Sequence, residues 1–308
     1  MPKINFRHFK YIAMKKTIKP YLFALSSIML WSTAAVAFKI ALKYMDFIQL
    51  LFISSLNSFF VLFIILVIKR EIKILASFTK KQYLNSAILG FLNPFAYYMV
   101  LLKAYSILPA QLAQPLNYTW PIMLVLLSAP LLGQKLNNRS LPAIFISFFG
   151  VYLISSQGQP FSMEISQPFG ILLATGSSVI WALFWIYNVK DKRPEIHKLV
   201  ISFFFSLFFI GLALFLFSTF KMPEFKGIVA AIYIGLFEMG FTFVLWLKAM
   251  QYVKRSDKIS NLVFISPFFS LIWIHLILGE NIYYTTIVGL IFIISGIFVH
   301  QLLTKPLK

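Results

Sequence analysis

The chain has 308 residues, of which 60% are hydrophobic and 12% are charged, and its mean hydropathy is +0.83. Soluble domains carry about 25% charged residues, so this composition excludes a soluble globular protein and indicates a chain that crosses a membrane several times. The formal net charge of +19 would suit a nucleic-acid-binding protein, but the basic residues lie in short loops between apolar stretches, which argues against that partner. The absence of cysteine excludes disulfides and thiolate metal sites.

Ten apolar stretches, each near the ~20 residues that cross a bilayer, predict an all-α integral membrane protein with ten transmembrane helices. In chain order these spans are residues 21–42, 47–68, 82–105, 111–132, 141–155, 168–189, 199–219, 227–250, 259–278 and 283–303. A basic segment, residues 1–20, precedes the first span, and a short tail, residues 304–308, follows the last. We expect the basic segment to lie beside anionic lipid in the cytoplasm.

The positions of the basic residues predict the orientation of the spans. Of the 28 Lys and Arg residues, 22 lie in the N-terminal segment, in the loops before spans three, five, seven and nine, or in the tail. Because Lys and Arg concentrate on the cytoplasmic side of membrane proteins, both termini are predicted to be cytoplasmic. The loops at 157–167 and 221–226 are then predicted to lie outside.

The chain repeats itself at a nearly constant offset of 145 to 150 residues. The matched pairs are Gly90 with Gly235, Lys103 with Lys248, Pro121 with Pro267, and Trp31 with Trp181. This series predicts two halves of five spans, residues 21–156 and 167–303. Because five is odd, the second half enters the membrane from the opposite side, and such inverted repeats enclose a shared central site that opens alternately to either face.

The fourth span begins with a polar stripe. Gln111, Gln114, Asn117, Tyr118 and Pro121 fall within roughly a 120° arc of one helical face. Two interpretations remain open for Gln114, Asn117 and Tyr118: they line a cavity and contact substrate, or they form hydrogen bonds between helices. The prolines remove backbone donors, which predicts a kink in this span.

Glu238 is the one acidic residue in the middle of a predicted span, and its repeat counterpart is Asn93. An ionisable group at this depth costs at least ~2.5 kcal/mol to insert, so it is expected to have a partner or a function. Glu238 and Asn93 are therefore candidate substrate-binding residues, together with Tyr97 and Thr242, which lie one turn further along. The functional roles are proton coupling or pairing with a substrate amine; the alternative is a neutral acid hydrogen-bonded to another helix.

Aromatic and basic side chains supply further candidates. Trp31, Trp181 and Trp185 could stack on a planar or cationic substrate, or simply pack the bundle, whereas Trp246 and Trp273 are read as packing residues. Lys39, Lys103 and Lys248 are read as anchors near the membrane surface, although Lys39, in the first span, could instead contact an anionic substrate. Glu280, at a helix end, is expected to accept hydrogen bonds from backbone donors of the segment that follows it.

Several residues resemble those of a known family. Trp31-Ser32 in the first span, and Pro267 with Gly279-Glu280 in the ninth, resemble the drug/metabolite transporter superfamily, and in particular bacterial proteins with two EamA domains. The resemblance implies that spans one, three, four, six, eight and nine surround a central cavity, with spans five and ten peripheral. The first half departs from the pattern, since Gln134 stands where Glu280 stands in the second half.

The function predicted from these observations is secondary transport of a small organic solute by alternating access. The resemblance implies an amino acid, a metabolite or a cationic drug, most often exported. The alternatives are uptake or exchange of a nucleotide-derived metabolite and a non-transporting membrane scaffold. An enzyme is not expected, because no phosphate-binding glycine loop, HExxH or GxSxG motif is present. No cofactor or metal is predicted; the predicted partners are the solute, the lipid bilayer and, as a candidate coupling ion, the proton.

Overall fold

The structure, a computed structural model, describes residues 6–133, 141–161, 166–219, 221–252 and 261–304. Within these ranges the chain is helical and contains no strand. Seven helical segments of the described chain are long and apolar enough to cross a membrane: 18–41, 47–68, 80–107, 168–190, 195–217, 225–249 and 284–303. They confirm seven of the predicted spans. Spans five and nine correspond to shorter apolar helices, 141–155 and 262–278, and span four is interrupted.

The elements of the first half follow the predicted spans closely. They are α1 (Phe6–Ser32), α2 (Ala34–Ala41), α3 (Phe47–Ile68), α4 (Ile72–Leu75), α5 (Lys80–Gly90), η1 (Phe91–Ala96), α6 (Tyr97–Ile107), α7 (Ala110–Asn117), α8 (Trp120–Leu132) and α9 (Leu141–Ser155). The first span differs from prediction at its start, because α1 begins at Phe6 and runs through Pro20. The basic N-terminal segment, from Phe6 onward, is thus a helical extension of the first span. Gln134 lies outside the described residues.

The second half contains α10 (Pro168–Lys190), α11 (Glu195–Phe217), α12 (Phe225–Tyr233), η3 (Ile234–Glu238), α13 (Phe241–Gln251), η4 (Asn261–Ile265), α15 (Ser266–Trp273), η5 (Ile274–Leu278) and α16 (Tyr284–Thr304). Spans three and eight are both irregular. Span three is kinked within η1, where the backbone of Asn93 is not helical, and span eight contains a π-helical turn, η3. Turns of the second kind are rare in helices and are frequent at functional sites.

The predicted kink in the fourth span is confirmed. Helix α7 ends at Asn117 and α8 begins at Trp120, with Tyr118 and Thr119 between them. Pro121 lies in the first turn of α8, where the missing backbone N–H has no partner to lose. The break gives α7 and α8 different directions and leaves α8 packed chiefly on α10.

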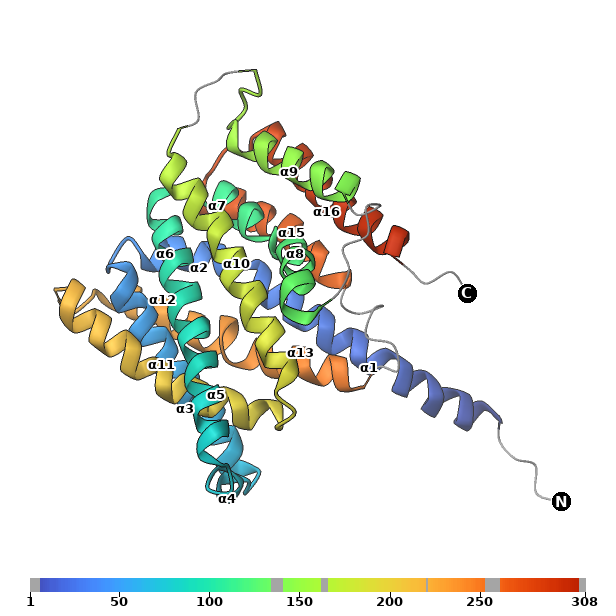
Figure 1. Ribbon diagram of the computed structural model, residues 1–308, viewed down its shortest axis with the longest axis vertical. Helices are drawn as coiled ribbons and strands as arrows, with labels where there is room; N and C mark the ends of the chain where they lie inside the picture. The colour runs from blue at the N-terminus through green and yellow to red at the C-terminus, as the bar shows by residue number, and fades with distance from the viewer. Residues whose placement is uncertain (1–5, 134–140, 162–165, 220, 253–260, 305–308) are drawn as a thin grey trace.

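Helices of the two halves pack on one another in a reciprocal pattern. Helix α1 packs on α13, and α10 packs on α6, so the first span of each half contacts the third span of the other (Figure 1). The second spans, α3 and α11, contact each other, and so do the fifth spans, α9 and α16. The fold therefore interleaves the halves, and its core lies at their boundary.

Two glycines explain how closely the halves approach. A Cβ built on Gly90 would lie 2.2 Å from the backbone oxygen of Ser202, and one built on Gly235 would lie 2.5 Å from that of Ser54. No larger residue fits at either position without moving a helix backbone. The repeat pair Gly90 and Gly235 thus makes equivalent contacts. Each contact joins the third span of one half to the second span of the other.

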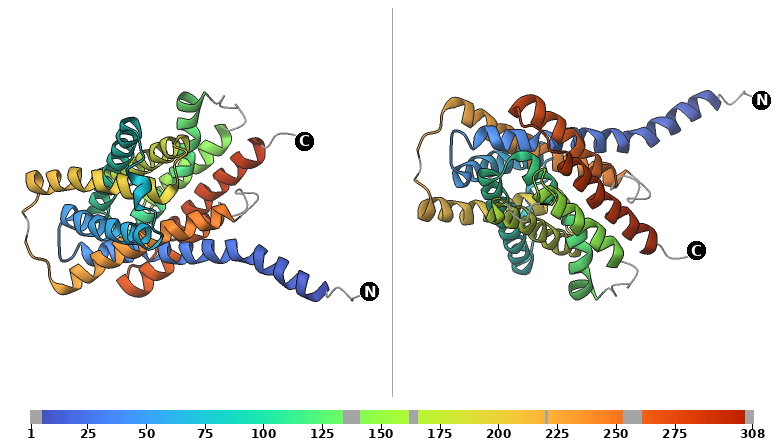
Figure 2. Two further views of the ribbon diagram at one scale, coloured as in Figure 1. Left: turned by 90° about the horizontal axis from the view of Figure 1, so that it is seen from below. Right: turned by 90° about the horizontal axis from the view of Figure 1, so that it is seen from above.

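Helices α9 and α16 form a separate pair at one edge of the molecule (Figures 1 and 2). Their backbones approach through Gly150, Gly289 and Gly296, where an added Cβ would meet the opposite helix within 2.6 Å. The hydroxyl of Ser147 donates a hydrogen bond to the carbonyl of Ile293 across this contact, at 3.2 Å. This peripheral placement agrees with what the resemblance implies for spans five and ten.

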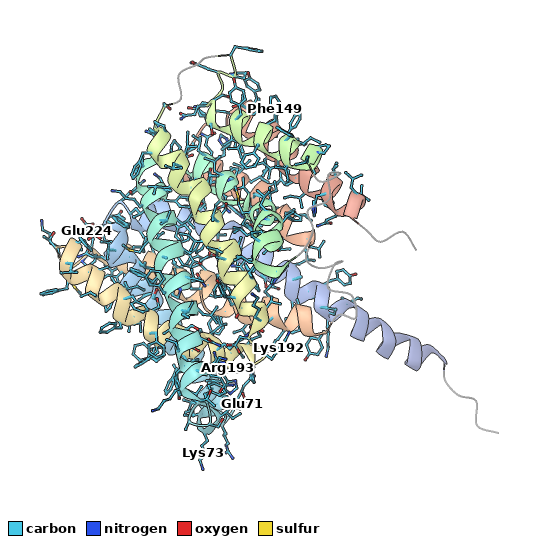
Figure 3. All side chains as sticks on the ribbon, in the orientation of Figure 1. Glu71, Lys73, Phe149, Lys192, Arg193 and Glu224 are labelled. Carbon is cyan, nitrogen blue, oxygen red and sulfur yellow. The ribbon has the colours of Figure 1, made fainter. Side chains whose placement is uncertain are left out.

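One end of the molecule carries a group of charged side chains. Glu71, Lys73, Lys192 and Arg193 gather there, away from Glu224 at another edge (Figure 3). Arg193 binds the carboxylate of Asp191 at 2.5 Å and donates to the hydroxyl of Ser86 at 2.8 Å. Burial would raise the pKa of Asp191, but the hydrogen bonds and charge of Arg193 outweigh it and lower that pKa. The turn before α11, which is predicted to be cytoplasmic, is thereby fastened to helix α5.

Candidate functional site

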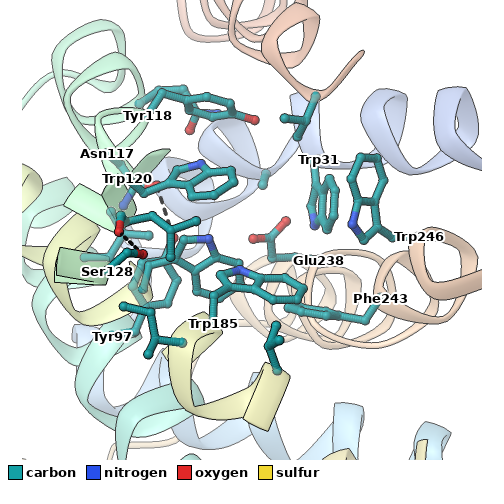
Figure 4. A pocket seen from close by; sticks show the side chains of 18 of the residues that line it. Trp31, Tyr97, Asn117, Tyr118, Trp120, Ser128, Trp185, Glu238, Phe243 and Trp246 are labelled. Carbon is teal, nitrogen blue, oxygen red and sulfur yellow. Dashed lines mark hydrogen bonds between the residues drawn. The ribbon is translucent and has the colours of Figure 1, made fainter. Parts of the chain in front are cut away.

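A central cavity of about 490 Å³ lies between the two halves (Figure 4). Its walls come from the six spans that the resemblance assigned to it: α1 and α2, α6, α7 and α8, α10, η3 and α13, and η4. The site residues predicted from the sequence that line it are Trp31, Tyr97, Gln114, Asn117, Tyr118, Trp181, Trp185 and Glu238. The volume is large enough for a small organic molecule.

Among the described residues, the cavity reaches the surface of the molecule at one end. Leu132, Val189 and Lys190 line it there, at the C-terminal ends of α8 and α10, and all three are solvent-exposed. We call this end the mouth. At the other end the lining residues are buried, among them Phe38 and Leu101. The cavity therefore has a mouth at one face and a floor below the middle of the bundle.

Glu238 is the acidic residue of the cavity wall. It ends the π-helical turn η3, and the following Gly240 has a non-helical backbone with φ −103° and ψ −92°. In Figure 4 its carboxylate lies in the space between the cavity tryptophans. Its Oε1 accepts a hydrogen bond from the Tyr98 hydroxyl at 3.0 Å, whereas its Oε2 is buried and has no hydrogen-bond partner among the described residues. One oxygen is thus held in place, and the hydrogen-bonding capacity of the other is not used within the described part of the chain.

Aromatic rings form a continuous belt around this carboxylate. Trp31 contacts Trp246 with ring centroids 5.3 Å apart, and Phe243 lies 6.1 Å from Trp31 and 6.0 Å from Trp181. Tyr97 continues the belt, 4.6 Å from Trp181. The interpretation of Trp246 as a packing residue alone is incomplete, because it also lines the cavity.

The amides of the polar stripe combine both predicted roles. Asn117 accepts a hydrogen bond from the Tyr97 hydroxyl at 3.1 Å and donates one to Ser177 at 2.8 Å. Gln114 accepts a hydrogen bond from the Tyr105 hydroxyl. Both amides also line the cavity, so they join helices while presenting polar atoms to its interior. Besides Oε2 of Glu238, Nε1 of Trp185 is buried and has no hydrogen-bond partner among the described residues.

Two predicted site residues do not line the cavity. Asn93 is buried in η1, with neither end of its amide hydrogen-bonded. Its backbone is extended, with φ −147° and ψ 125°, so the helical spacing that aligned it with Tyr97 does not apply. Thr242 is fully buried and donates its hydroxyl to the carbonyl of Phe237 inside its own span. The extension of the polar strip from Glu238 to Thr242 is therefore absent from the cavity surface.

Lys39 and Gln111 lie beyond the floor. Lys39 is half-buried and donates to the carbonyls of Tyr105 and Leu108 at 3.0 and 3.1 Å. Gln111 is buried, and its side chain binds backbone groups of Asn281 and Tyr283.

The fold and the cavity together define a polytopic helical membrane protein with a binding chamber formed by both halves. The model of the EamA-like transporter family matches residues 18–156 and 168–300. The chain therefore belongs to the EamA-like transporter family, and it is a membrane protein of the kind that moves a small solute across the bilayer.

Proteins similar over most of their length carry the same description. An uncharacterized transporter of Archaeoglobus fulgidus is 25% identical over 284 residues, covering 91% of this chain and 96% of the relative. The uncharacterized transporter YoaV of Bacillus subtilis is 26% identical, covering 92% and 97%. A solved crystal structure aligns with a TM-score of 0.67 at 20% identity, covering 93% of this chain and 97% of the other. At that identity the structure supports the fold alone.

Proposed function

We propose that this protein is a secondary transporter of small organic cations, in particular amines that carry an aromatic or apolar group. The observation that carries the proposal is the unpartnered Oε2 of Glu238 inside a cavity walled by tryptophans. Leaving a buried carboxylate oxygen without a hydrogen-bond donor is unfavourable, and an ammonium group of a ligand would supply the missing donor. Tryptophan faces attract cations by up to ~2 kcal/mol each when the site is dry.

The distribution of positive charge supports a cation over an anion. Lys39, the basic residue that could have served a phosphate-bearing substrate, binds backbone carbonyls outside the cavity. Lys190 lines the mouth, where it donates to the carbonyl of Leu131 at 3.3 Å. This arrangement disfavours the nucleotide-derived substrates considered from the sequence. It leaves amines, including amino acids and cationic drugs, as the proposed class.

The reciprocal packing of the halves supports transport by alternating access. Equivalent close contacts at Gly90 and Gly235 are those expected of an inverted repeat. Our proposal includes ten spans in two inverted halves, residues 21–156 and 167–303, in the inner membrane with both termini cytoplasmic. The start of α1 and the end of α16 lie on one side of the molecule (Figure 2), as that topology requires. The mouth then faces the cytoplasm, which suits export.

The substrate class is tested by binding to the purified protein. Radiolabelled tryptamine should bind and should be displaced by unlabelled tryptamine and phenyltrimethylammonium. Tryptophol and indole-3-propionate keep the indole ring but are neutral and anionic, so they should compete at least about tenfold less well. Equal competition by the neutral or anionic compound would show that Glu238 does not select a cation.

Transport itself is tested by counterflow in proteoliposomes. Internal phenyltrimethylammonium should accelerate uptake of the same labelled cation, because exchange requires the cavity to open at both faces. Liposomes that contain the protein but show no acceleration over protein-free liposomes would support the scaffold alternative.

The proposed orientation has an independent test. The chain contains no cysteine, so Gln159→Cys, in an exposed stretch before α10, introduces a unique label site. A membrane-impermeant maleimide should label it in intact cells. Labelling only after permeabilisation would reverse the proposed orientation.

A further inference from the structure

The end of the cavity opposite the mouth is closed by contacts between the two halves. Glu280, which follows η5, places its carboxylate at the N-terminus of α7, where Oε1 accepts from the backbone N–H of Ala110 at 2.8 Å and Oε2 from that of Gln111 at 3.0 Å. This corrects the expectation that Glu280 would cap the segment following it. A carboxylate is favoured there because free N–H groups and the helix dipole make a helix N-terminus positive.

Gln111 completes the contact. Its Nε2 donates to the carbonyl of Asn281 at 2.8 Å, and its Oε1 accepts from the backbone N–H of Tyr283 at 2.9 Å. Four hydrogen bonds thus join α7 to the Glu280–Tyr283 segment, about 170 residues away in the chain. We call Gln111, Glu280 and these backbone groups the latch.

Lys39 supports the same turn from its other side. Its ammonium binds the carbonyls of Tyr105 and Leu108, at the C-terminal end of α6, where a positive charge is favoured. The turn between α6 and α7 is therefore held by a cation on its carbonyl side and by Glu280 on its N–H side. Packing is tight around it, since Leu108, Ala110 and Gln111 are all buried.

The latch lies directly beneath the cavity floor. Gln111 is one helical turn from Gln114, which lines the cavity, and α7 contacts α2, α15 and α16 around it (Figure 1). A path through this end must therefore separate α7 from the Glu280–Tyr283 segment. Water that enters between the two segments can form hydrogen bonds with the groups of the latch. Separation of α7 from the Glu280–Tyr283 segment therefore leaves none of these groups without a hydrogen-bond partner.

We propose that Glu280 and Gln111 act as the gate at the closed end of the cavity, and that breaking their hydrogen bonds between the halves is required for the cavity to open there. This inference rests on the proposed transport function, since a static scaffold would have no need to open at this end. The gate joins segments of both halves. Movement of one half against the other would therefore control whether the cavity opens at this end.

The gate is tested by thiol accessibility, which requires no knowledge of the solute. Ala34 lines the cavity and is buried, and Ala34→Cys is a small change. The membrane-impermeant cation 2-(trimethylammonium)ethyl methanethiosulfonate is applied to right-side-out and inverted vesicles. With the latch intact, the cysteine should react readily from the mouth face and slowly from the closed face.

Adding Glu280→Gln to this background should raise the reaction rate from the closed face by about tenfold, because a weakened latch shifts the population towards opening at that face. The amide offers one acceptor oxygen where the carboxylate offers two. Gln111→Ala should act in the same direction by removing the other two hydrogen bonds. The matched control is Glu224→Gln, since Glu224 is exposed and its side chain caps no backbone donor; it should leave both rates unchanged.

Unchanged closed-face rates in both latch variants would overturn the gate, and so would equal reaction from both faces with the latch intact. Gel filtration of each variant excludes unfolding as the cause of a faster rate. Failure of the proposed function gives a different result: no counterflow of phenyltrimethylammonium by a protein whose latch variants still change the accessibility of Ala34→Cys.

Discussion

The third and eighth spans occupy matched places in the two halves, yet they differ where the chemistry is concentrated. Both are irregular at the same place, with a kink in η1 and a π-helical turn in η3, close to a glycine that contacts a serine carbonyl of the other half. Within this irregular segment the eighth span presents Glu238 to the cavity, whereas the third span buries Asn93 away from it. The backbone contacts are repeated, and the proposed binding side chain is not.

This difference indicates how a repeated fold acquires a specific site. The backbone contacts that position the two spans need the same small residues in both halves, so they follow the repeat. A binding group needs only one copy, because two carboxylates in one apolar chamber would repel each other and cost more to bury. The comparison predicts which substitutions act alike in the two halves and which do not.

The largest effect should come from the shared glycines. Gly90→Ala and Gly235→Ala each place a methyl group against a backbone oxygen, so each should lower the free energy of unfolding by about 1–3 kcal/mol or more. Gly176→Ala is the control, because nothing lies within 4 Å of its Cβ position. Denaturation by sodium dodecyl sulfate in mixed micelles measures all three. Normal stability of either tight variant would contradict the reciprocal packing.

Substrate affinity should show the clearest difference between the two halves, because Glu238→Gln should weaken binding and a change at Asn93 should not. The amide keeps the hydrogen bond with Tyr98 but carries no charge, so tryptamine affinity should fall about thirtyfold or more. Asn93→Ala should change that affinity by less than about twofold, because Asn93 does not line the cavity. The equilibrium binding assay described above compares them.

The same variant separates the roles of the carboxylate. If the variant loses both tryptamine binding and counterflow of phenyltrimethylammonium, the result would support pairing of Glu238 with the amine. Loss of pH-driven accumulation with exchange preserved would instead support proton coupling. Wild-type behaviour in both assays would remove Glu238 from the mechanism.

The matched tryptophans should have intermediate effects. Trp31→Leu and Trp181→Leu retain an apolar side chain but remove the ring face, so each should weaken tryptamine binding by up to ~2 kcal/mol, or roughly thirtyfold. Trp273→Leu is the control, since its indole donates to Ser32 and does not line the cavity. Equal affinity in all three variants would assign the cavity tryptophans to packing.

Asn117→Ala should have the smallest effect. It removes the hydrogen bonds to Tyr97 and Ser177, and interhelical hydrogen bonds in membranes average ~0.6 kcal/mol. Ser128→Ala is the control, because Ser128 lines the cavity but bonds only within its own helix. A drop in stability without a change in affinity would assign Asn117 to helix packing alone. Gln114→Ala extends the test to the other amide.

The sequence predicted what depends on periodicity and composition. Long apolar runs located seven membrane-length helices, and isolated polarity in such a run identified Glu238. The prediction did not extend to contacts between distant segments. The partner of Glu280 lies about 170 residues away, and no local pattern specifies it. Asn93 was misplaced for a related reason, because an extended residue inside a helical span breaks the angular spacing on which the prediction depended.

Five of the six tryptophans line the cavity: Trp31, Trp120, Trp181, Trp185 and Trp246. Tryptophan dominates the near-ultraviolet emission of a protein, so most of the intrinsic fluorescence of this chain should originate from residues that line the cavity. Occupancy of the chamber by a solute should quench or shift that emission. Solute binding could therefore be followed by the intrinsic tryptophan fluorescence of the protein, without an added label.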